Sequence, residues 1–445
     1  MNSFKPMLLT SLKSYDRAQF AKDVTAGIIV AIIALPLSIA LALASGVGPE
    51  AGIFTAIVAG FVISALGGSC VQIAGPTAAF ATIVAGIVAR DGLEGLMTAT
   101  ILAGVFLIIM GFCHFGSLIK FIPYTITTGF TSGIAVTIVI GQLKDFCGVT
   151  YPDGVKPIET MEKLKAFAEN FSTISPDALI VGGVSLAILI VSPLIFKRIP
   201  GSLIAVIVGI LMVQFLPLHV STIGNLYTIS NALPTLHLPV FDMKLIQSAI
   251  PNAFTIAVLA AIESLLSCVV ADGMINSKHR SDTELIAQGA GNIASALFGG
   301  IPATGAIART AANIKNGGRT PVAGIVHSIT LVIVLVVLMP FAGMIPMPTI
   351  AAILFLVAYN MCQWRTFVHL VRTAPKSDII VLFTTFVLTV VFDLVVAIEI
   401  GMVLACLLFI KRMSEETHAD SWVYVDDDSP AVDEHLQKLP LEIRV

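Results

Sequence analysis

Long apolar segments alternate with short polar connections along most of the chain. A helix needs about 20 apolar residues to cross the hydrocarbon core of a bilayer, and this length predicts about fourteen membrane helices. The candidates span residues 23–44, 51–67, 76–89, 95–113, 124–146, 178–196, 202–217, 248–272, 284–299, 304–314, 320–339, 344–360, 377–393 and 395–412. The third and the tenth are too short to cross alone, so we expect both to be half-helices.

The composition agrees with a membrane protein. Of the 445 residues, 56% are hydrophobic and 12% are charged, whereas a soluble domain has about 25% charged residues. The six cysteines are scattered without metal-ligand spacing, and no hydrolase or phosphate-binding motif is present. We therefore expect an all-α, multi-pass membrane protein that contacts lipid, is not an enzyme, and has no metal, cofactor or nucleic-acid partner.

Lysine and arginine residues gather in alternate connections between the apolar segments. They are dense before residue 23, at 197–198, 278–280 and 315–319, from 365 to 376, and at 411–412. Cytoplasmic connections of membrane proteins collect Lys and Arg. This pattern predicts an even number of spans, with both termini on the cytoplasmic side of a bacterial inner membrane.

A short sequence occurs twice, the second copy about 230 residues after the first. Residues 64–68 read SALGG and are followed by GPTA at 75–78, while residues 295–300 read SALFGG and are followed by IPATG at 301–305. Both copies precede a shortened apolar segment. Paired Gly/Pro interruptions at corresponding places in two halves are the best sequence indication of a transporter binding site.

The starts of the two half-helices are candidates for an anion site. A helix start leaves four backbone N–H groups unpaired and carries about half a positive charge. If Thr77 and Thr304 open two facing half-helices, their hydroxyls add donors, and Ala78 and Gly305 permit close approach of the backbone to a ligand. The alternative is that these Gly-Pro motifs only end helices at loops.

Two charged residues lie within apolar segments. Arg309 belongs to the tenth segment, where a central arginine costs about 2.5–3.5 kcal/mol. It could face the substrate or pair with a carboxylate, or it could reach the cytoplasmic interface beside Lys315.

Glu263 lies in the eighth segment with Ser267 one helical turn away. It could bind a coupling proton or ion, or form a structural salt bridge with Arg309, in which case protonation of Glu263 would free Arg309 for the substrate.

Several motifs resemble those of the SulP family of anion transporters. The matching residues are 35–40 (LPLSIA), 75–80 (GPTAAF), 262–266 (IESLL), 272–279, 284–293 (ELIAQGAGNI) and 308–310 (ART). The resemblance covers residues from about 20 to 412, and within the family it is strongest to enterobacterial C4-dicarboxylate carriers.

This resemblance implies a uracil-permease-like fold of two inverted seven-helix repeats. Helices one to four and eight to eleven would form a mobile core that moves like an elevator, and the others would form a gate in a dimer. The implied substrate site consists of Thr77, Ala78, Thr304, Gly305 and Arg309, and we expect Leu37 and Ala303 to line it as well. The implied coupling site consists of Glu263 and Ser267. Sodium-coupled bicarbonate carriers of the family have Asp at the acidic position, so Glu263 favours protons over sodium here.

The expected organisation has six parts. They are a cytoplasmic lead at 1–22, core helices and one gate helix at 23–146, outer loops and gate helices at 147–246, core helices at 247–340, gate helices at 341–412, and a cytoplasmic stub at 413–445. The family's usual cytoplasmic STAS domain is expected to be missing beyond that stub.

The sequence thus predicts a secondary transporter of a small anion, with proton coupling. Sulfate, a C4-dicarboxylate and bicarbonate all suit backbone N–H groups and one arginine. The alternatives are an anion channel or exchanger and a sodium-coupled bicarbonate symporter on the same fold. A nucleobase permease shares the architecture, but Arg309 argues against a neutral substrate.

Overall fold

The computed structural model describes residues 4–117, 124–152, 157–195, 200–239 and 243–391, with five further residues between 400 and 407. Eight of the helices in these ranges are long and apolar enough to cross a membrane, and Gly201–Phe215 is a shorter apolar helix. The predicted helix at 395–412 lies largely outside the described residues, and the predicted stub at 413–445 lies wholly outside them.

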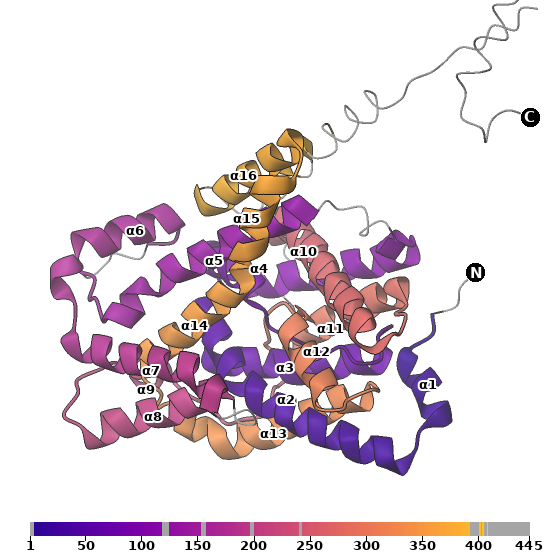
Figure 1. The fold of residues 1–445 in the computed structure, drawn as a ribbon, viewed down its shortest axis with the longest axis horizontal. Helices are drawn as coiled ribbons and strands as arrows, with labels where there is room; N and C mark the ends of the chain where they lie inside the picture. The colour runs from indigo at the N-terminus through magenta and orange to yellow at the C-terminus, as the bar shows by residue number, and fades with distance from the viewer. Residues whose placement is uncertain are drawn as a thin grey trace, which may run out of the picture. The chain divides into compact units, whose positions relative to one another are not determined.

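Figure 1 traces the elements in chain order. The first half contains α1 (Met7–Ser11), η1 (Leu12–Ser14), α2 (Arg17–Ala44), α3 (Pro49–Leu66), β1 (Ala74–Gly75), α4 (Ala78–Phe112), α5 (Tyr124–Cys147), α6 (Thr160–Glu169), η3 (Phe171–Thr173), α7 (Pro176–Ile195), α8 (Gly201–Phe215) and α9 (Ile223–Leu226). The second half contains α10 (Met243–Ile275), α11 (Ser281–Leu297), β2 (Thr304–Gly305), α12 (Ile307–Lys315), α13 (Val322–Ala342), α14 (Met347–Cys362), α15 (Trp364–Thr373) and α16 (Lys376–Val391).

Local sequence explains where several of these helices begin and bend. Asp16 caps α2 because its carboxylate accepts a hydrogen bond from the backbone N–H of Gln19 at 2.6 Å. Pro49 occupies the first turn of α3, where a missing N–H costs nothing. Gly92 interrupts α4 with φ of 70° and ψ of −168°, which only glycine adopts readily. The two segments predicted at 76–89 and 95–113 therefore lie on either side of this glycine.

The described helices pack in two groups. The core helices, which we define as α2, α3, α4, α10, α11, α12 and α13, pack mainly on one another. The gate helices, defined as α5, α7, α8, α14 and α16, do the same, with α5 against α14 and α16 and with α7 against α8 and α14. Each group contains helices from both halves of the chain.

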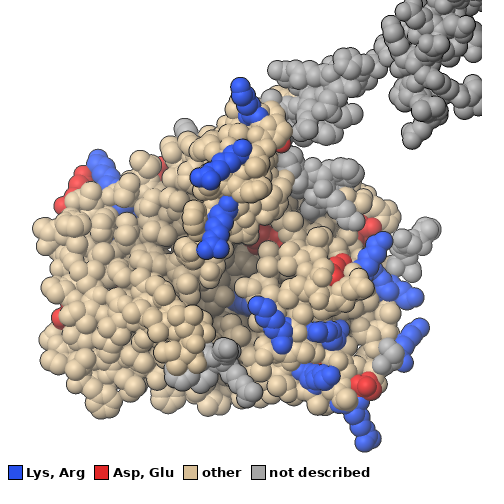
Figure 2. All heavy atoms as spheres, in the orientation of Figure 1, with Lys and Arg blue, Asp and Glu red and all other residues tan. Residues whose placement is uncertain are grey.

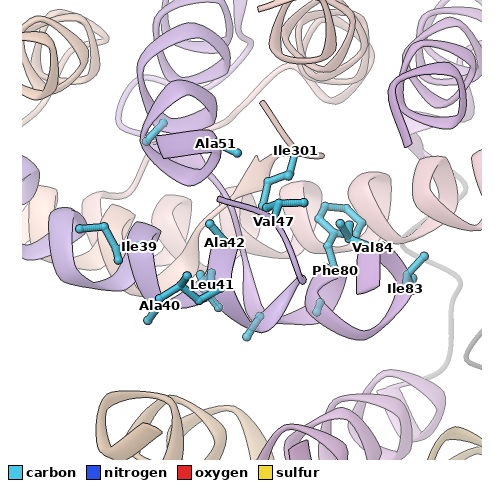
Figure 3. Packing of buried hydrophobic residues seen from close by; sticks show 14 of the residues in the cluster. Ile39, Ala40, Leu41, Ala42, Val47, Ala51, Phe80, Ile83, Val84 and Ile301 are labelled. Atoms are coloured by element: carbon cyan, nitrogen blue, oxygen red, sulfur yellow. The ribbon is translucent and has the colours of Figure 1, made fainter. Parts of the chain in front are cut away.

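One large apolar cluster surrounds the breaks in the core helices. Figure 3 shows part of it, with Ile39 to Ala42 from the end of α2 and Phe80, Ile83 and Val84 from the first turns of α4. Ile301, which precedes β2, belongs to the same cluster. Its well-packed side chains give the two interrupted segments a rigid support.

The two strands are the centre of the core. Ala74 of β1 pairs with Gly305 of β2, and Gly75 pairs with Thr304, in an antiparallel ribbon. Residues about 230 positions apart are thereby placed side by side. Antiparallel pairing of corresponding segments is what two repeats of opposite orientation predict.

Candidate functional site

Each strand of the short β ribbon is followed by a helix, and the two helices begin at positions that do not correspond in the repeat. Thr77 is the N-cap residue of α4, which begins at Ala78, as the sequence predicts. The prediction that Thr304 opens the second half-helix is wrong. Thr304 and Gly305 lie in β2, and α12 begins at Ile307 with Ala306 as N-cap. Pairing with β1 keeps these two residues extended, so the second helix starts three residues later.

The hydroxyl of Thr304 is committed to the scaffold. Thr304 Oγ1 donates to the carbonyl oxygen of Ala260 at 3.2 Å and lies 2.6 Å from Ser264 Oγ. The backbone N–H of Gly305 donates to Ser264 Oγ at 3.1 Å. Because all of these atoms are buried, the second copy of the repeat uses its polar groups to hold β2 against α10.

Polar side chains of α11 and α3 fix the segment before β2. The side-chain amide of Asn292 forms two hydrogen bonds with the backbone of Ala303. Its Oδ1 accepts from the Ala303 N–H at 2.8 Å, and its Nδ2 donates to the Ala303 carbonyl oxygen at 2.9 Å. Thr55 of α3 accepts from the N–H of Ile301 at 2.7 Å, and Ser295 donates to the carbonyl of Ile301 at 2.8 Å. These bonds satisfy backbone groups that would otherwise be buried without partners.

Glu284 of α11 does the same for the segment before β1. Its side chain is fully buried and accepts from the N–H groups of Gly68 at 2.8 Å and Ser69 at 3.2 Å. The side-chain amides of Gln72 and Gln288 donate to its other oxygen at 2.8 and 2.9 Å. One carboxylate therefore holds the first broken segment of the chain against a helix of the second half.

Arg309 is the largest fully buried side chain in the described part of the chain, with 1% of its surface exposed. Its Nη2 donates to Ser38 Oγ of α2 at 3.1 Å and to the carbonyl of Pro76 at 3.4 Å. Its Nε and Nη1 have no hydrogen-bond partner within the described ranges. A Cβ built on Gly75 would collide with Nη1, so glycine at this position lets the guanidinium reach the start of α4.

Glu263 does not neutralise that charge. Among the described residues no ion pair joins Arg309 to Glu263 or to another carboxylate. Glu263 is half-buried instead, and its Oε2 accepts a hydrogen bond from the hydroxyl of Thr77 at 3.0 Å. The alternative of a structural salt bridge between Glu263 and Arg309 is therefore wrong for this conformation.

The remaining predicted residues have different exposures. Leu37 and Thr77 are half-buried, whereas Ala78, Ala303 and Ser267 are buried. Ser267 Oγ lies 3.4 Å from Thr310 Oγ1, so it contacts the helix that carries Arg309 rather than Glu263. The structure thus brings Thr77, Glu263 and Arg309 around the start of α4, with Ser267 behind them.

The site has a positive balance of charge. Each half-helix start contributes roughly +0.5 charge, and Arg309 contributes a full charge that has no acidic partner among the residues the structure describes. Glu263 is the carboxylate that contacts this group of residues. The sum is about +1 with Glu263 ionised and about +2 with it protonated. Backbone donors and a buried cation around one point suit a small anion.

Sequence reasoning missed the polar residues that support the site. Glu284, Gln288 and Asn292 recur every four residues on α11 and so share one helical face, which marks a polar stripe inside an apolar helix. That spacing could have identified them. Ser38 and Ser264 belong to motifs that were noticed, but only the fold reveals that they contact Arg309 and Thr304.

Comparison with known proteins agrees with this arrangement. The sulfate permease family matches residues 20–385 of the chain. This chain belongs to that family. Its relatives include YvdB of Bacillus subtilis, a candidate sulfate transporter by name, which is 42% identical over 414 residues that cover 91% of this chain and 76% of YvdB. The bicarbonate transporter BicA of a Picosynechococcus species is 35% identical, with 88% of this chain and 70% of BicA covered.

Solved structures of this anion-transporter family have the same fold. The transmembrane domain of a cyanobacterial BicA superposes with a TM-score of 0.77 at 30% identity, covering 86% of this chain and 98% of that domain. Murine Slc26a9 in its inward-facing state superposes with a TM-score of 0.83 at 20% identity, covering 91% of this chain and 71% of that protein. The second likeness concerns the fold alone.

Proposed function

We propose that this protein is a secondary active transporter that binds a small anion at the starts of α4 and α12. The observation that carries this proposal is the state of Arg309, which is fully buried and has two nitrogen atoms without hydrogen-bond partners among the described residues. A buried, unneutralised charge is strongly unfavourable in a protein interior. An anion that binds beside the two helix starts would neutralise it, so the cost is offset only when substrate is present.

The contact between Thr77 and Glu263 supports a role for protons in this transport. While Glu263 is ionised, its carboxylate holds the Thr77 hydroxyl and adds a negative charge to the anion site. Two unit charges 4 Å apart interact by about 4 kcal/mol at an effective dielectric constant of 20. A proton on Glu263 removes that repulsion and releases the hydroxyl for the anion. This mechanism replaces the one in which protonation would break a pair between Glu263 and Arg309.

The helix grouping suggests how the anion crosses. Every residue of the candidate site lies on a core helix, on a strand between core helices or in the segments that adjoin these strands. Movement of the core helices against the gate helices would carry the intact site across the membrane, as in an elevator. We expect the gate helices to stay fixed in a homodimer.

The orientation in a bacterial inner membrane also remains a proposal, with both termini cytoplasmic. On the face in Figure 2, many of the Lys and Arg side chains lie over the region that carries α1, α12 and α15, and few lie over α7 and α8. Cytoplasmic sides of membrane proteins are rich in these residues, which supports this orientation.

The identity of the anion stays open between three candidates. Sulfate and bicarbonate are named for relatives of this chain, and C4-dicarboxylates are expected from the motif resemblance. Each carries oxygen atoms that can accept from backbone N–H groups and from a guanidinium. None needs a metal ion at the site.

Uptake into proteoliposomes tests the proposal. Purified protein is reconstituted, and labelled sulfate, bicarbonate and succinate are supplied at two pH values, with and without sodium. We expect one of the three to accumulate above its equilibrium level when the outside is more acidic, without a need for sodium. Flux that only follows the anion gradient would instead indicate a channel or exchanger, and strict sodium dependence would indicate a sodium symporter.

A further inference from the structure

His327 on α13 is a buried residue that the proposed mechanism does not use. Its imidazole has no exposed surface, and in the described part of the chain neither ring nitrogen has a hydrogen-bond partner. A buried polar group without a partner costs about 1–3 kcal/mol. Such groups in a folded protein call for a specific explanation.

The neighbours of His327 place it beside β1 and α3. A Cβ built on Gly60 of α3 would lie 3.3 Å from the carbonyl oxygen of Ala74 and 3.9 Å from His327 Nδ1. The Ala74 carbonyl oxygen and His327 Nδ1 therefore both lie next to Gly60. Ala74 pairs with Gly305, and the next residue, Gly75, is in contact with the guanidinium of Arg309. His327 and Arg309 thus approach consecutive residues of the same strand.

The unpartnered atoms around β1 are chemically complementary. Arg309 contributes Nε and Nη1, which can only donate. The neutral imidazole of His327 keeps one nitrogen lone pair that can accept a hydrogen bond. Ser64 of α3 faces the same stretch of α13 at Gly324. Its hydroxyl also has no hydrogen-bond partner among the described residues. Its hydroxyl can accept from the other ring nitrogen.

We propose that His327 is a positioning residue for the anion site. Its neutral imidazole accepts a hydrogen bond from the Arg309 guanidinium, either after a small side-chain shift or through one water molecule. This bond fixes the plane of the guanidinium, so that the remaining donors face the anion beside the start of α4. The inference rests on the proposed function, because it assigns the role of a second residue to the same site.

Replacement of His327 tests the proposal. His327→Leu keeps much of the volume but removes the acceptor, whereas His327→Asn and His327→Gln retain an acceptor near the Nδ1 and Nε2 positions respectively. Ser328→Ala is the matched control on α13, because Ser328 also faces α3. The measurement is the Kd for sulfate, bicarbonate and succinate in turn, with the melting temperature recorded for every variant.

We expect His327→Leu to raise the Kd about tenfold without lowering the melting temperature. At least one of the two amide variants, His327→Asn or His327→Gln, should have a Kd within about threefold of the wild-type value. Ser328→Ala should have the same Kd as wild type. In an Arg309→Gln background, His327→Leu should have no additional effect, since the two residues act through one bond.

An unchanged Kd in His327→Leu would overturn the proposal. It would also be overturned if His327→Leu raised the Kd by the same factor in the Arg309→Gln background as in wild type. If Arg309→Gln itself leaves the Kd unchanged, the proposed function fails instead, so the two failures are distinguishable. Should His327→Leu not fold, the comparison of His327→Asn and His327→Gln in the two backgrounds decides by the same criterion.

Discussion

The two copies of the repeated sequence form similar backbones but carry different chemistry. In the first copy, Thr77 is half-buried and its hydroxyl binds the carboxylate of Glu263. In the second, Thr304 is fully buried and its hydroxyl binds the backbone of α10. Arg309 comes from the second copy, yet it donates to Pro76 of the first. The repeat therefore supplies a symmetric backbone, but the side chains at its two copies differ. The first copy contacts a titratable group, Glu263, which we call the titratable side, and the second carries the permanent charge of Arg309.

The largest expected effect comes from removing the permanent charge. Arg309→Ala should weaken anion binding about 100-fold, because charged hydrogen bonds and an opposite charge are lost together. The same variant should melt at an equal or higher temperature without anion, since it removes a buried unpaired charge. Binding assays and thermal melts in detergent check both results.

Arg319→Ala is the matched control for that experiment. Arg319 lies in the connection after α12, where its guanidinium donates to backbone carbonyls of Ile314 and Gly318. It should leave anion affinity within about twofold of wild type. Equal losses of affinity in the two variants would mean that Arg309 acts only through general electrostatics.

The second effect concerns the titratable side. Glu263→Gln should still bind the anion, because the amide removes the negative charge and resembles the protonated acid. It should lose uphill accumulation and the rise of uptake that wild type has as the pH falls. Flux in proteoliposomes with and without a pH gradient provides the measurement. Full uphill uptake with an unchanged pH response would disprove the coupling role.

A smaller effect separates the scaffold from the site. Glu284→Ala should destabilise the protein by about 3 kcal/mol, because four donors lose a buried acceptor at once. The expected result is a clear drop in melting temperature. The anion Kd of the molecules that remain folded should stay close to that of wild type.

The smallest effects come from the two threonines, which give the sharpest test of the asymmetry. Thr77→Val should alter the pH dependence of anion binding by removing the hydroxyl between Glu263 and the anion. Thr304→Val should lower stability by about 1 kcal/mol and leave the pH dependence alone. Paired pH titrations and melts of the two variants distinguish them. If Thr77→Val and Thr304→Val show the same pH dependence of anion binding and the same stability, the proposed difference between the two copies of the repeat is wrong.

The sequence predicts the positions of the breaks because glycine, proline and charge stand out in apolar segments. Gly75-Pro76, Ile301-Pro302, Arg309 and Glu263 were all visible in this way. The strand pairing was not, since two residues on each side give no periodic signal and the partners are far apart in sequence. Consequently the sequence predicts the start of this helix at residue 304, three residues before α12 begins.

The relation between Glu263 and Arg309 also required the fold. Opposite charges in two apolar segments suggest a pair, but rotation of the helices decides whether they meet. Here Arg309 faces α2 and the end of β1, while Glu263 faces Thr77. The polar stripe of α11 was predictable from its four-residue spacing. The isolation of His327 was not, because a single histidine on an apolar helix gives no information about its partners.

The central claim is that a proton on Glu263 and an anion near Arg309 favour each other. Such coupling is reciprocal, so an anion that binds must draw a proton onto the protein. The most direct test adds sulfate, bicarbonate or succinate to protein in a weakly buffered detergent solution and follows the pH. The account predicts uptake of up to one proton per bound anion by wild type and none by Glu263→Gln. Equal proton uptake by both proteins, or none by wild type despite anion binding, would contradict it.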